Sequence, residues 1–394
     1  MKPNAFRPQF EFELYDNLLR NSFYKKISEE QLNKVSLAHQ QEQTFAFLTN
    51  GILINSMNSP ALFAAFEIAK RKLKISNRVK IDLYIENNPE INAGIAFLGD
   101  KKYAIYLNSG LINLLNIEEL KFVIGHELGH FKYKHHKIIK KSTKKILPSL
   151  LLRLYEHSRY AEIAADRCGL IACSSSKTAK SSLLKIATGS DLKYFNSDVT
   201  EYKNQIKEIK KLLSNDNSLI NEKLSHPYSL IRIYAIEVFE KAFFKKTSDN
   251  ISEFEQVDKK ILSLLSVLNP KPNNYKNKLT IYASFWVSYS HIKNLTIEKE
   301  NIENISDPVI LNKILKESKN MPDKERFFKD SFVRNIKKGN NLSLSDKSDI
   351  LDRICSVAAC DGQIQTKEND VIYKISNLLD LKENYVKSVI RKFE

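Results

Sequence analysis

The segment His126-Glu-Leu-Gly-His130 constrains this chain more than any other part of its sequence. Each residue of an α-helix advances by about 100°, so two histidines four residues apart project from one face and can bind the same metal ion. Glu127 lies beside the first histidine, where a carboxylate can take a proton from a metal-bound water. The spacing predicts a zinc site in which His126 and His130 are ligands and Glu127 is the general base.

The residues before this segment predict that it lies in a helix. Leu120, Val123 and Ile124 recur at helical spacing, which is typical of an amphipathic helix and not of a loop. The alternative is a helix that merely exposes two histidines, because the motif specifies only three residues and the chain has 8 histidines among 394 residues.

A pair of acids downstream offers a third ligand. Residues 158–166 are rich in alanine and favour a helix, in which Glu162 and Asp166 would share one face. One carboxylate could bind zinc while the other accepts the free N–H of a ligand histidine. An ordinary acidic helix face is the alternative, but a pair in this place supplies what a catalytic site with two histidines and one glutamate requires.

His136 is a competing candidate for the third ligand. It stands where the longer pattern His-Glu-x-x-His-x-x-Gly-x-x-His has its last histidine. That pattern needs a glycine to turn the chain back, and here Tyr133 occupies the position. We therefore expect the helix to continue and to carry His136 away from the metal.

A small sheet is expected before the metal helix. Residues 59–74 predict a helix that starts with a Ser cap and a Pro, and residues 79–85 and 103–107 predict two strands. An edge strand beside the metal could hold an extended peptide by main-chain hydrogen bonds, although a sheet that serves only as scaffold fits equally well. Residues 1–40 predict short polar helices, to which we assign no chemistry.

In combination, these features resemble the HtpX and CAAX-prenyl-protease type 1 family of gluzincin metallopeptidases. The matching segments are Ile91-Asn-Ala-Gly94, Leu107-Asn-Ser-Gly-Leu111, His126–His130, Glu162–Asp166, and Ser225-His-Pro227 with Arg232. The resemblance covers residues 45–242. It implies a gluzincin peptidase domain that is mostly helical, with a small sheet beside the metal helix.

The resemblance also implies roles for individual residues. One Zn²⁺ would be bound by His126, His130 and Glu162. Glu127 would be the general base, and Asp166 would support a ligand histidine from behind.

Three further residues follow from the same resemblance. His226, in a His-Pro pair, would act in catalysis by donating a hydrogen bond to the oxyanion or by shaping the site, unless it only begins a helix. Asn92 and Arg232 would contact the substrate or the oxyanion.

The chain departs from this family in one respect. Many members have transmembrane helices around the site or between the two ligand helices, whereas residues 131–146 are a short connection with seven lysines. No run approaches the roughly 18 apolar residues of a spanning helix, and residues 1–8 lack the apolar core of a secretory signal. We therefore expect a cytoplasmic protein without a transmembrane segment, for which peripheral contact with a membrane surface stays open.

The net charge of +16 could attract nucleic acid or anionic membrane. The chain is rich in Lys, Asn and Ile throughout, which indicates a compositional bias and not a basic face. No recognition motif with interleaved aromatic residues accompanies the charge. We therefore expect no nucleic-acid partner.

Residues 351–381 resemble the TerB-like family of helical domains. An apolar helix is followed by Ala358-Ala-Cys-Asp-Gly-Gln-Ile364, and Glu368 would open the next helix. Asp361 and Glu368 could bind a divalent cation, but a turn at Gly362 capped by Asp361 is the simpler alternative. The resemblance implies an interaction or regulatory module that binds a protein partner.

The expected fold class is mainly α (α+β), a zinc-peptidase domain with a small sheet followed by an all-helical C-terminal domain. The predicted parts are a helical segment at 1–44, the metallopeptidase domain at 45–245, a linker and helical region at 246–340, and the TerB-like domain at 341–394. The predicted function is that of a zinc-dependent endopeptidase acting on protein or peptide substrates. The alternative is a catalytically silent, zinc-stabilised protein that binds polypeptide and recruits partners through its C-terminal domain.

Overall fold

The chain divides into two compact units. One comprises Met1–Ile139 with Leu154–Pro270, and the other comprises Lys140–Arg153 with Lys271–Glu394. The computed structural model describes residues 6–20, 37–99, 102–138, 148–194, 200–215, 228–243, 251–265, 274–291, 295–306, 308–337, 342, 344–360, 362–391 and 393.

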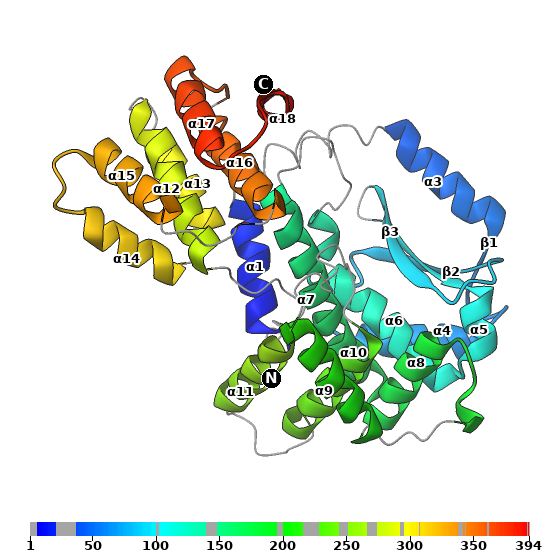
Figure 1. Cartoon of the computed structure of the whole chain (residues 1–394). Coiled ribbons are helices and arrows are strands. Elements are labelled where there is room, and N and C mark those ends of the chain that lie inside the picture. The colour runs from blue at the N-terminus through cyan, green and yellow to red at the C-terminus, as the bar shows by residue number, and fades with distance from the viewer. Residues whose placement is uncertain are drawn as a thin grey trace. The chain divides into compact units, whose positions relative to one another are not determined.

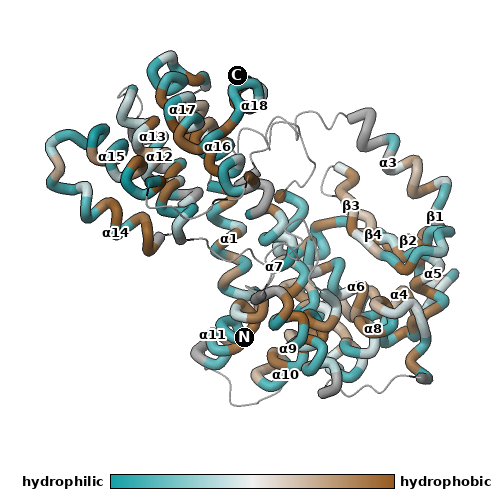
Figure 2. Tube along the Cα trace, in the orientation of Figure 1, coloured by the Kyte–Doolittle hydropathy of each residue, from teal (hydrophilic) through white to brown (hydrophobic). Residues whose placement is uncertain are grey.

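The first unit contains a four-stranded sheet. Its strands are β1 (Gly51–Leu53), β2 (Lys80–Glu86), β3 (Ala93–Gly99) and β4 (Lys102–Asn108). The strand order is β1-β2-β4-β3, with β2 parallel to β4 and the other neighbouring pairs antiparallel. β3 is therefore an edge strand among the described residues. β3 is largely hydrophobic (Figure 2), whereas β2 and β4 mix apolar and polar residues.

Helices cover both faces of this sheet. They are α3 (Leu37–Asn50), α4 (Pro60–Lys72), α5 (Ser109–Leu114) and α6 (Ile117–Lys132). α3 packs on one face, where Phe47 contacts Tyr84 and Tyr106, while α4 and α6 lie along the other face (Figure 1). α6, which carries the His-Glu-x-x-His segment, contacts both α4 and the edge strand β3.

The other helices of the first unit follow α6 in the chain, apart from α1 at its start. They are α1 (Gln9–Arg20), α7 (Pro148–Cys173, in this unit from Leu154 on), α8 (Ser176–Thr188), α9 (Thr200–Asn215), α10 (Ser229–Phe243) and α11 (Ile251–Leu265), with short 3-10 turns η1 (His135–Lys137) and η2 (Leu192–Tyr194). α8 contacts α6 and α10, and α11 contacts α10 and α1. The N-terminal helix is thus packed into the same unit as the metal helix.

Glycines let α6 and α7 approach closely. A Cβ at Gly129 would lie 2.9 Å from Ala165 Cα, and a Cβ at Gly125 would collide with the methyl group of Ala172. From the other side, a Cβ at Gly169 would lie 2.8 Å from the carbonyl oxygen of Phe122. Glycine in a helix interior costs about 1 kcal/mol relative to alanine. In return, the absence of side chains at these glycines lets α6 and α7 pack closely, which brings the other side chains of the two helices together.

The mainly helical fold with a small sheet, expected from the sequence, is confirmed. α4, β2 and β4 match the predicted elements, and the helix predicted around the two downstream acids is part of α7. β1 and β3 were not predicted. β1 has only three residues, and β3 begins and ends with small residues that are depleted in strands, so neither carries a strong strand pattern.

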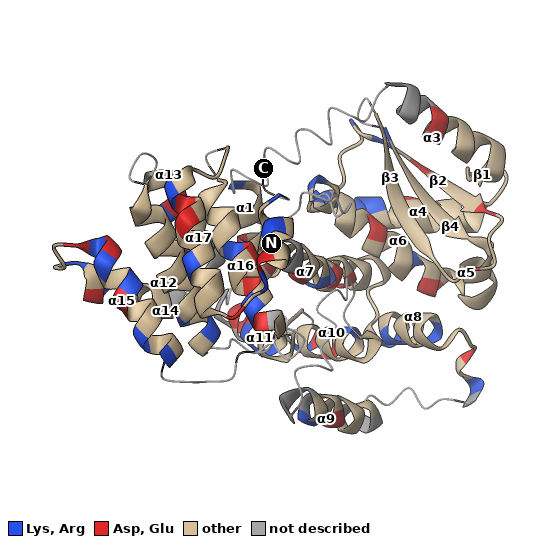
Figure 3. Ribbon diagram, turned by 45° about the horizontal axis from the view of Figure 1, so that its top comes forward, with Lys and Arg blue, Asp and Glu red and all other residues tan. Residues whose placement is uncertain are grey.

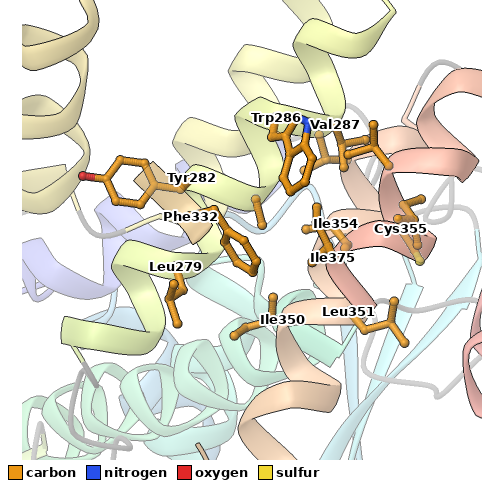
Figure 4. Packing of buried hydrophobic residues seen from close by; sticks show 14 of the residues in the cluster. Leu279, Tyr282, Trp286, Val287, Phe332, Ile350, Leu351, Ile354, Cys355 and Ile375 are labelled. Atoms are coloured by element: carbon orange, nitrogen blue, oxygen red, sulfur yellow. The ribbon is translucent and has the colours of Figure 1, made fainter. Parts of the chain in front are cut away.

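The second unit is all-helical in its described residues. Its helices are α12 (Asn274–Ser290), α13 (Leu295–Ile305), α14 (Pro308–Ser318), α15 (Lys324–Lys337), α16 (Leu344–Ala358), α17 (Thr366–Leu378) and α18 (Glu383–Ile390). α12 is the central helix, since it contacts α13 to α17. Trp286 on α12 packs on Phe332, and Figure 4 shows both side chains within one cluster that also includes Ile350 and Ile375.

The turn before α17 bears on the TerB-like prediction. Gly362 has φ +121°, and Glu368 forms a capping box with Gln365 at the start of α17. Asp361, the suggested cap or cation ligand, lies outside the described residues. The TerB-like resemblance and the predicted domain boundaries stay predictions.

Charged residues of both signs are mixed along α15 and α17, as Figure 3 shows. Within the described ranges, none of the helices combines the length and the hydropathy that crossing a membrane would take.

Candidate metal centre

α6 places the His-Glu-x-x-His segment in a well-defined helix. Asn116 caps its first turn by accepting hydrogen bonds from the backbone N–H groups of Glu118 and Glu119, and the Glu119 carboxylate accepts from the N–H of Asn116 in return. Residues 119–129 are all buried. The segment therefore points its side chains into the protein and not into solvent.

Three donor groups from two helices converge at the centre of the unit. His126 and His130 come from α6 and Glu162 comes from α7, and their ligand atoms all lie within 4.8 Å of one another. His126 Nε2 is 3.1 Å from His130 Nε2, and each of these nitrogens is 3.4 Å from an oxygen of Glu162. In the described part of the chain, this is the one such group of metal-ligating side chains.

The spacing of these atoms fits a zinc ion. Tetrahedral ligands at zinc distances of 2.0–2.1 Å stand about 3.3 Å from one another, close to the separations between these donors. Two imidazoles and a carboxylate are also the donor set of many catalytic zinc sites, which keep a fourth position for solvent. His126, His130 and Glu162 could therefore hold a single ion.

His126 is supported by a charged pair. Its Nδ1 lies 2.9 Å from Asp166 Oδ1. Arg232 on α10 donates to both oxygens of Asp166, at 2.8 and 2.6 Å, and its Nη1 lies 3.4 Å from Glu162. With Nδ1–H donated to Asp166, the lone pair of Nε2 faces the other ligands, as metal binding requires.

The pKa values follow from these contacts. Burial opposes a charge on His126, but its hydrogen bonds to Asp166 and Glu162 outweigh burial and raise its pKa to about 10 in the absence of metal. Burial would raise the pKa of both carboxyls, yet the charge of Arg232 and the hydrogen bonds hold the pKa of Glu162 well below its usual value and lower that of Asp166. A metal ion that binds here must therefore displace a proton from His126.

His130 has a different partner, which the sequence did not suggest. Its Nδ1 lies 2.8 Å from Nδ1 of His135, a buried residue of η1. Burial lowers the pKa of His135 to about 3, so this imidazole is neutral. The other ring nitrogen of His135 lies 3.2 Å from Glu11 on α1.

The expected continuation of the metal helix through Tyr133 is wrong. α6 ends at Lys132, Lys134 takes a left-handed conformation with φ 59°, and the chain turns into η1. This turn brings His135 into contact with His130. His136 stays outside the ligand group, and the His136 ring stacks on Phe97. No glycine signals the turn, so the helix end could not be read from the sequence.

The proposed base, Glu127, is buried beside the ligand group. Burial, followed by the negative charges of Glu127 and Glu86, raises the pKa of Tyr106 on β4. The hydroxyl of Tyr106 thus stays protonated at neutral pH.

The remaining predicted site residues lie in different places. Arg232 faces the carboxylates of Asp166 and Glu162, and its predicted contact with the substrate or the oxyanion stays a prediction. Asn92 is exposed just before β3, where its side-chain oxygen accepts from the N–H of Ala93. His226 lies outside the described residues.

Two histidines from one helix and a glutamate from a second helix define the class of site, which is the two-histidine, one-glutamate arrangement of zinc-dependent hydrolases. Residues 63–155 match the family model of Peptidase family M48, so this part of the chain is similar to that metallopeptidase family. The matched residues include His126, Glu127 and His130, and they end before Glu162.

A curated relative supports this match. Over 184 residues, the chain is 27% identical to the plastoglobule-localized metallopeptidase 48, chloroplastic, of Arabidopsis thaliana. The aligned part covers 42% of this chain and 54% of that protein, so the chain spans about half the length of the relative. No solved structure matches the chain.

Proposed function

We propose that this protein is a zinc-dependent endopeptidase that hydrolyses peptide bonds in protein substrates. The observation that carries the proposal is the convergence of His126, His130 and Glu162 at zinc spacing, with Glu127 buried next to them. The match of residues 63–155 to a metallopeptidase family supports it.

Each residue of the site has a distinct task in this proposal. Zinc held by the three donors would polarise the scissile carbonyl and lower the pKa of water. Glu127 takes the proton of the attacking water and passes it to the leaving amine. Asp166 keeps His126 in the required tautomer. His226 is retained as a candidate donor to the oxyanion.

The edge of the sheet supports the proposal that the substrate is a peptide. β3 is the edge strand beside α6, so in the described residues its outer main-chain groups are not paired with another strand. An extended peptide could add to such an edge by main-chain hydrogen bonds, which hold a polypeptide whatever its side chains. In this proposal Asn92, exposed just before β3, contacts such a peptide.

The test is the Glu127→Gln variant. We expect it to retain bound zinc, measured by metal analysis, and to lose cleavage of a fluorescently labelled unfolded protein by at least about 100-fold, because the general base is gone. The matched control is Glu118→Gln, an exposed acid of the same helix, which should cleave as the wild type does.

Two results would contradict the proposal. Full cleavage by Glu127→Gln would remove the assigned base. Wild-type protein that binds zinc and unfolded polypeptide without any chelator-sensitive cleavage would favour the alternative, a zinc-stabilised binding protein.

The setting of the activity is also proposed. We infer a cytoplasmic location, contact with a membrane surface at most peripheral, and a protein partner for the TerB-like region. Nucleic acid is not among the proposed partners.

A further inference from the structure

Glu11 on α1 is a fully buried acid close to the metal centre. It has 0% exposure, and Arg7 donates to its two oxygens at 2.5 and 2.9 Å. Nε2 of His157 on α7 lies 3.3 Å from Glu11 Oε1, and Nε2 of His135 lies 3.2 Å from the same oxygen. A carboxylate with so many partners has a defined orientation, although it lies more than a hundred residues before the metal helix in the sequence.

The N-terminal helix is held in place by independent contacts. The backbone N–H of Gln9 donates to Asp258 on α11 at 2.8 Å, and Asp258 in turn accepts from Arg167 on α7 at 2.6 Å. The ring of Phe10 packs edge-on against Tyr160, with 4.8 Å between centroids. The position of Glu11 is therefore set by the core of the unit and does not depend on its contact with His135.

The hydrogens along this row of side chains can be assigned. His130 must present a bare Nε2 to a metal, so its Nδ1 carries the hydrogen and donates to Nδ1 of His135 at 2.8 Å. His135 then carries its own hydrogen on Nε2, the nitrogen that faces Glu11. His130 thus has its acceptor in His135, while Nε2 of His135 lies 3.2 Å from the Glu11 carboxylate, at ion-pair distance but without hydrogen-bond geometry.

We propose that His135 is a positioning residue that holds His130 in its metal-binding tautomer and orientation, and that the negative charge of Glu11 keeps the hydrogen of His135 on Nε2. The inference rests on the proposed zinc site. Partners of this kind behind a ligand histidine typically change metal affinity by 10–100-fold when they are removed. The N-terminal helix thereby contributes to the metal centre without touching the ion.

The decisive measurement is zinc affinity of the full chain, by competition with a chromophoric chelator. His135→Ala should weaken zinc binding by roughly 10–100-fold. The matched control is His136→Ala, which removes the neighbouring histidine of the same turn, stacked on Phe97 and outside the ligand group, and should leave the affinity unchanged.

Conservative variants separate positioning from mere packing. His135→Asn places an acceptor oxygen near the position of Nδ1 and should recover part of the affinity, whereas a residue that only filled space would not be replaced in this way. Glu11→Gln, one step further from the ion, should weaken zinc binding by less than His135→Ala does. Glu13→Gln, an exposed acid of the same helix, should have no effect.

A spectroscopic readout is independent of cleavage. In the cobalt-substituted protein, the visible absorption bands report ligand geometry, so they should change in His135→Ala and Glu11→Gln and stay constant in His136→Ala and Glu13→Gln. If His135→Ala does not fold, as judged by circular dichroism, His135→Asn and Glu11→Gln decide the question.

The outcomes distinguish this inference from the proposed function. Wild-type affinity and an unchanged cobalt spectrum in folded His135→Ala, or in both His135→Asn and Glu11→Gln, would overturn the positioning role and leave the peptidase proposal intact. A wild-type protein that binds no zinc would overturn both.

Discussion

The two ligand histidines of α6 are supported in opposite ways. His126 donates to Asp166, whose charge is balanced by the guanidinium of Arg232. His130 donates to a neutral imidazole, that of His135. The carboxylate on this side, that of Glu11, contacts the other ring nitrogen of His135. His126 thus contacts a charged side chain directly, whereas the imidazole of His135 lies between His130 and the charged side chain of Glu11.

The difference teaches how each support depends on the fold. Asp166 lies four residues after Glu162 on the same helix, so one helix supplies both a ligand and a support. The support of His130 requires a left-handed turn at Lys134 and an N-terminal helix from the far end of the sequence. We therefore expect the His126 side to respond mainly to changes of charge and the His130 side mainly to changes of geometry.

The largest effect should come from Asp166→Ala. The variant leaves Arg232 buried without its main partner, and breaking a buried pair in this way costs about 3–5 kcal/mol of unfolding free energy. Urea unfolding of the metal-free protein measures the loss. Removal of both charges in Asp166→Ala with Arg232→Met should recover part of it, and a loss below about 1 kcal/mol would show that the charged support is not what we describe.

A smaller effect is expected from Gly125→Ala, which tests the close contact of α6 with α7, the helix that carries Glu162 and Asp166. The added methyl would collide with Ala172, so the variant should lose about 1–3 kcal/mol of unfolding free energy. The double variant Gly125→Ala with Ala172→Gly removes the methyl group that the new alanine would meet, so it should recover part of the lost stability. Thermal unfolding compares the three proteins, and full stability of the single variant would contradict the close approach.

The smallest effect is expected from Glu11→Gln, and it should depend on pH. Burial raises the pKa of Glu11, but hydrogen bonds from Arg7, His135 and His157 outweigh burial and hold it well below the usual value. A lowered pKa means that the ionised group stabilises the fold above the unfolded pKa of about 4.3, and that this contribution is lost as the pH falls through the folded pKa.

The variant should therefore be less stable than the wild type by about 1 kcal/mol at pH 7. The gap should shrink as the pH falls below about 4, because the carboxyl of the unfolded wild-type chain then binds a proton while that of the folded chain is still ionised. Urea unfolding across this pH range measures the gap, with Glu13→Gln as the control. A gap that grows on acidification would contradict the assigned ionisation.

Much of the site could be read from the sequence. Helical periodicity alone places His126 and His130 on one face, and it places Glu162 and Asp166 on one face of a second helix. The mainly helical fold and two of the four strands follow from patterns of the same short range. Such predictions succeed because the geometry within one helix or strand depends on neighbouring residues.

The rest required distant parts of the chain to meet. His135 and Glu11 carry no local signal, since the turn that places the first has no glycine and the second lies in a segment to which we assigned no chemistry. Arg232 was expected to contact the substrate or the oxyanion, which stays a prediction, and the packing of α10 adds its ion pairs with two buried carboxylates.

The sequence by itself determined which side chains are available to bind a metal and which helices present them. The tertiary structure decided how each ligand is oriented, because that depends on close packing at glycines and on buried charges brought together from α1, α6, α7 and α10. Such contacts form only when the chain has folded, and no spacing along the sequence encodes them.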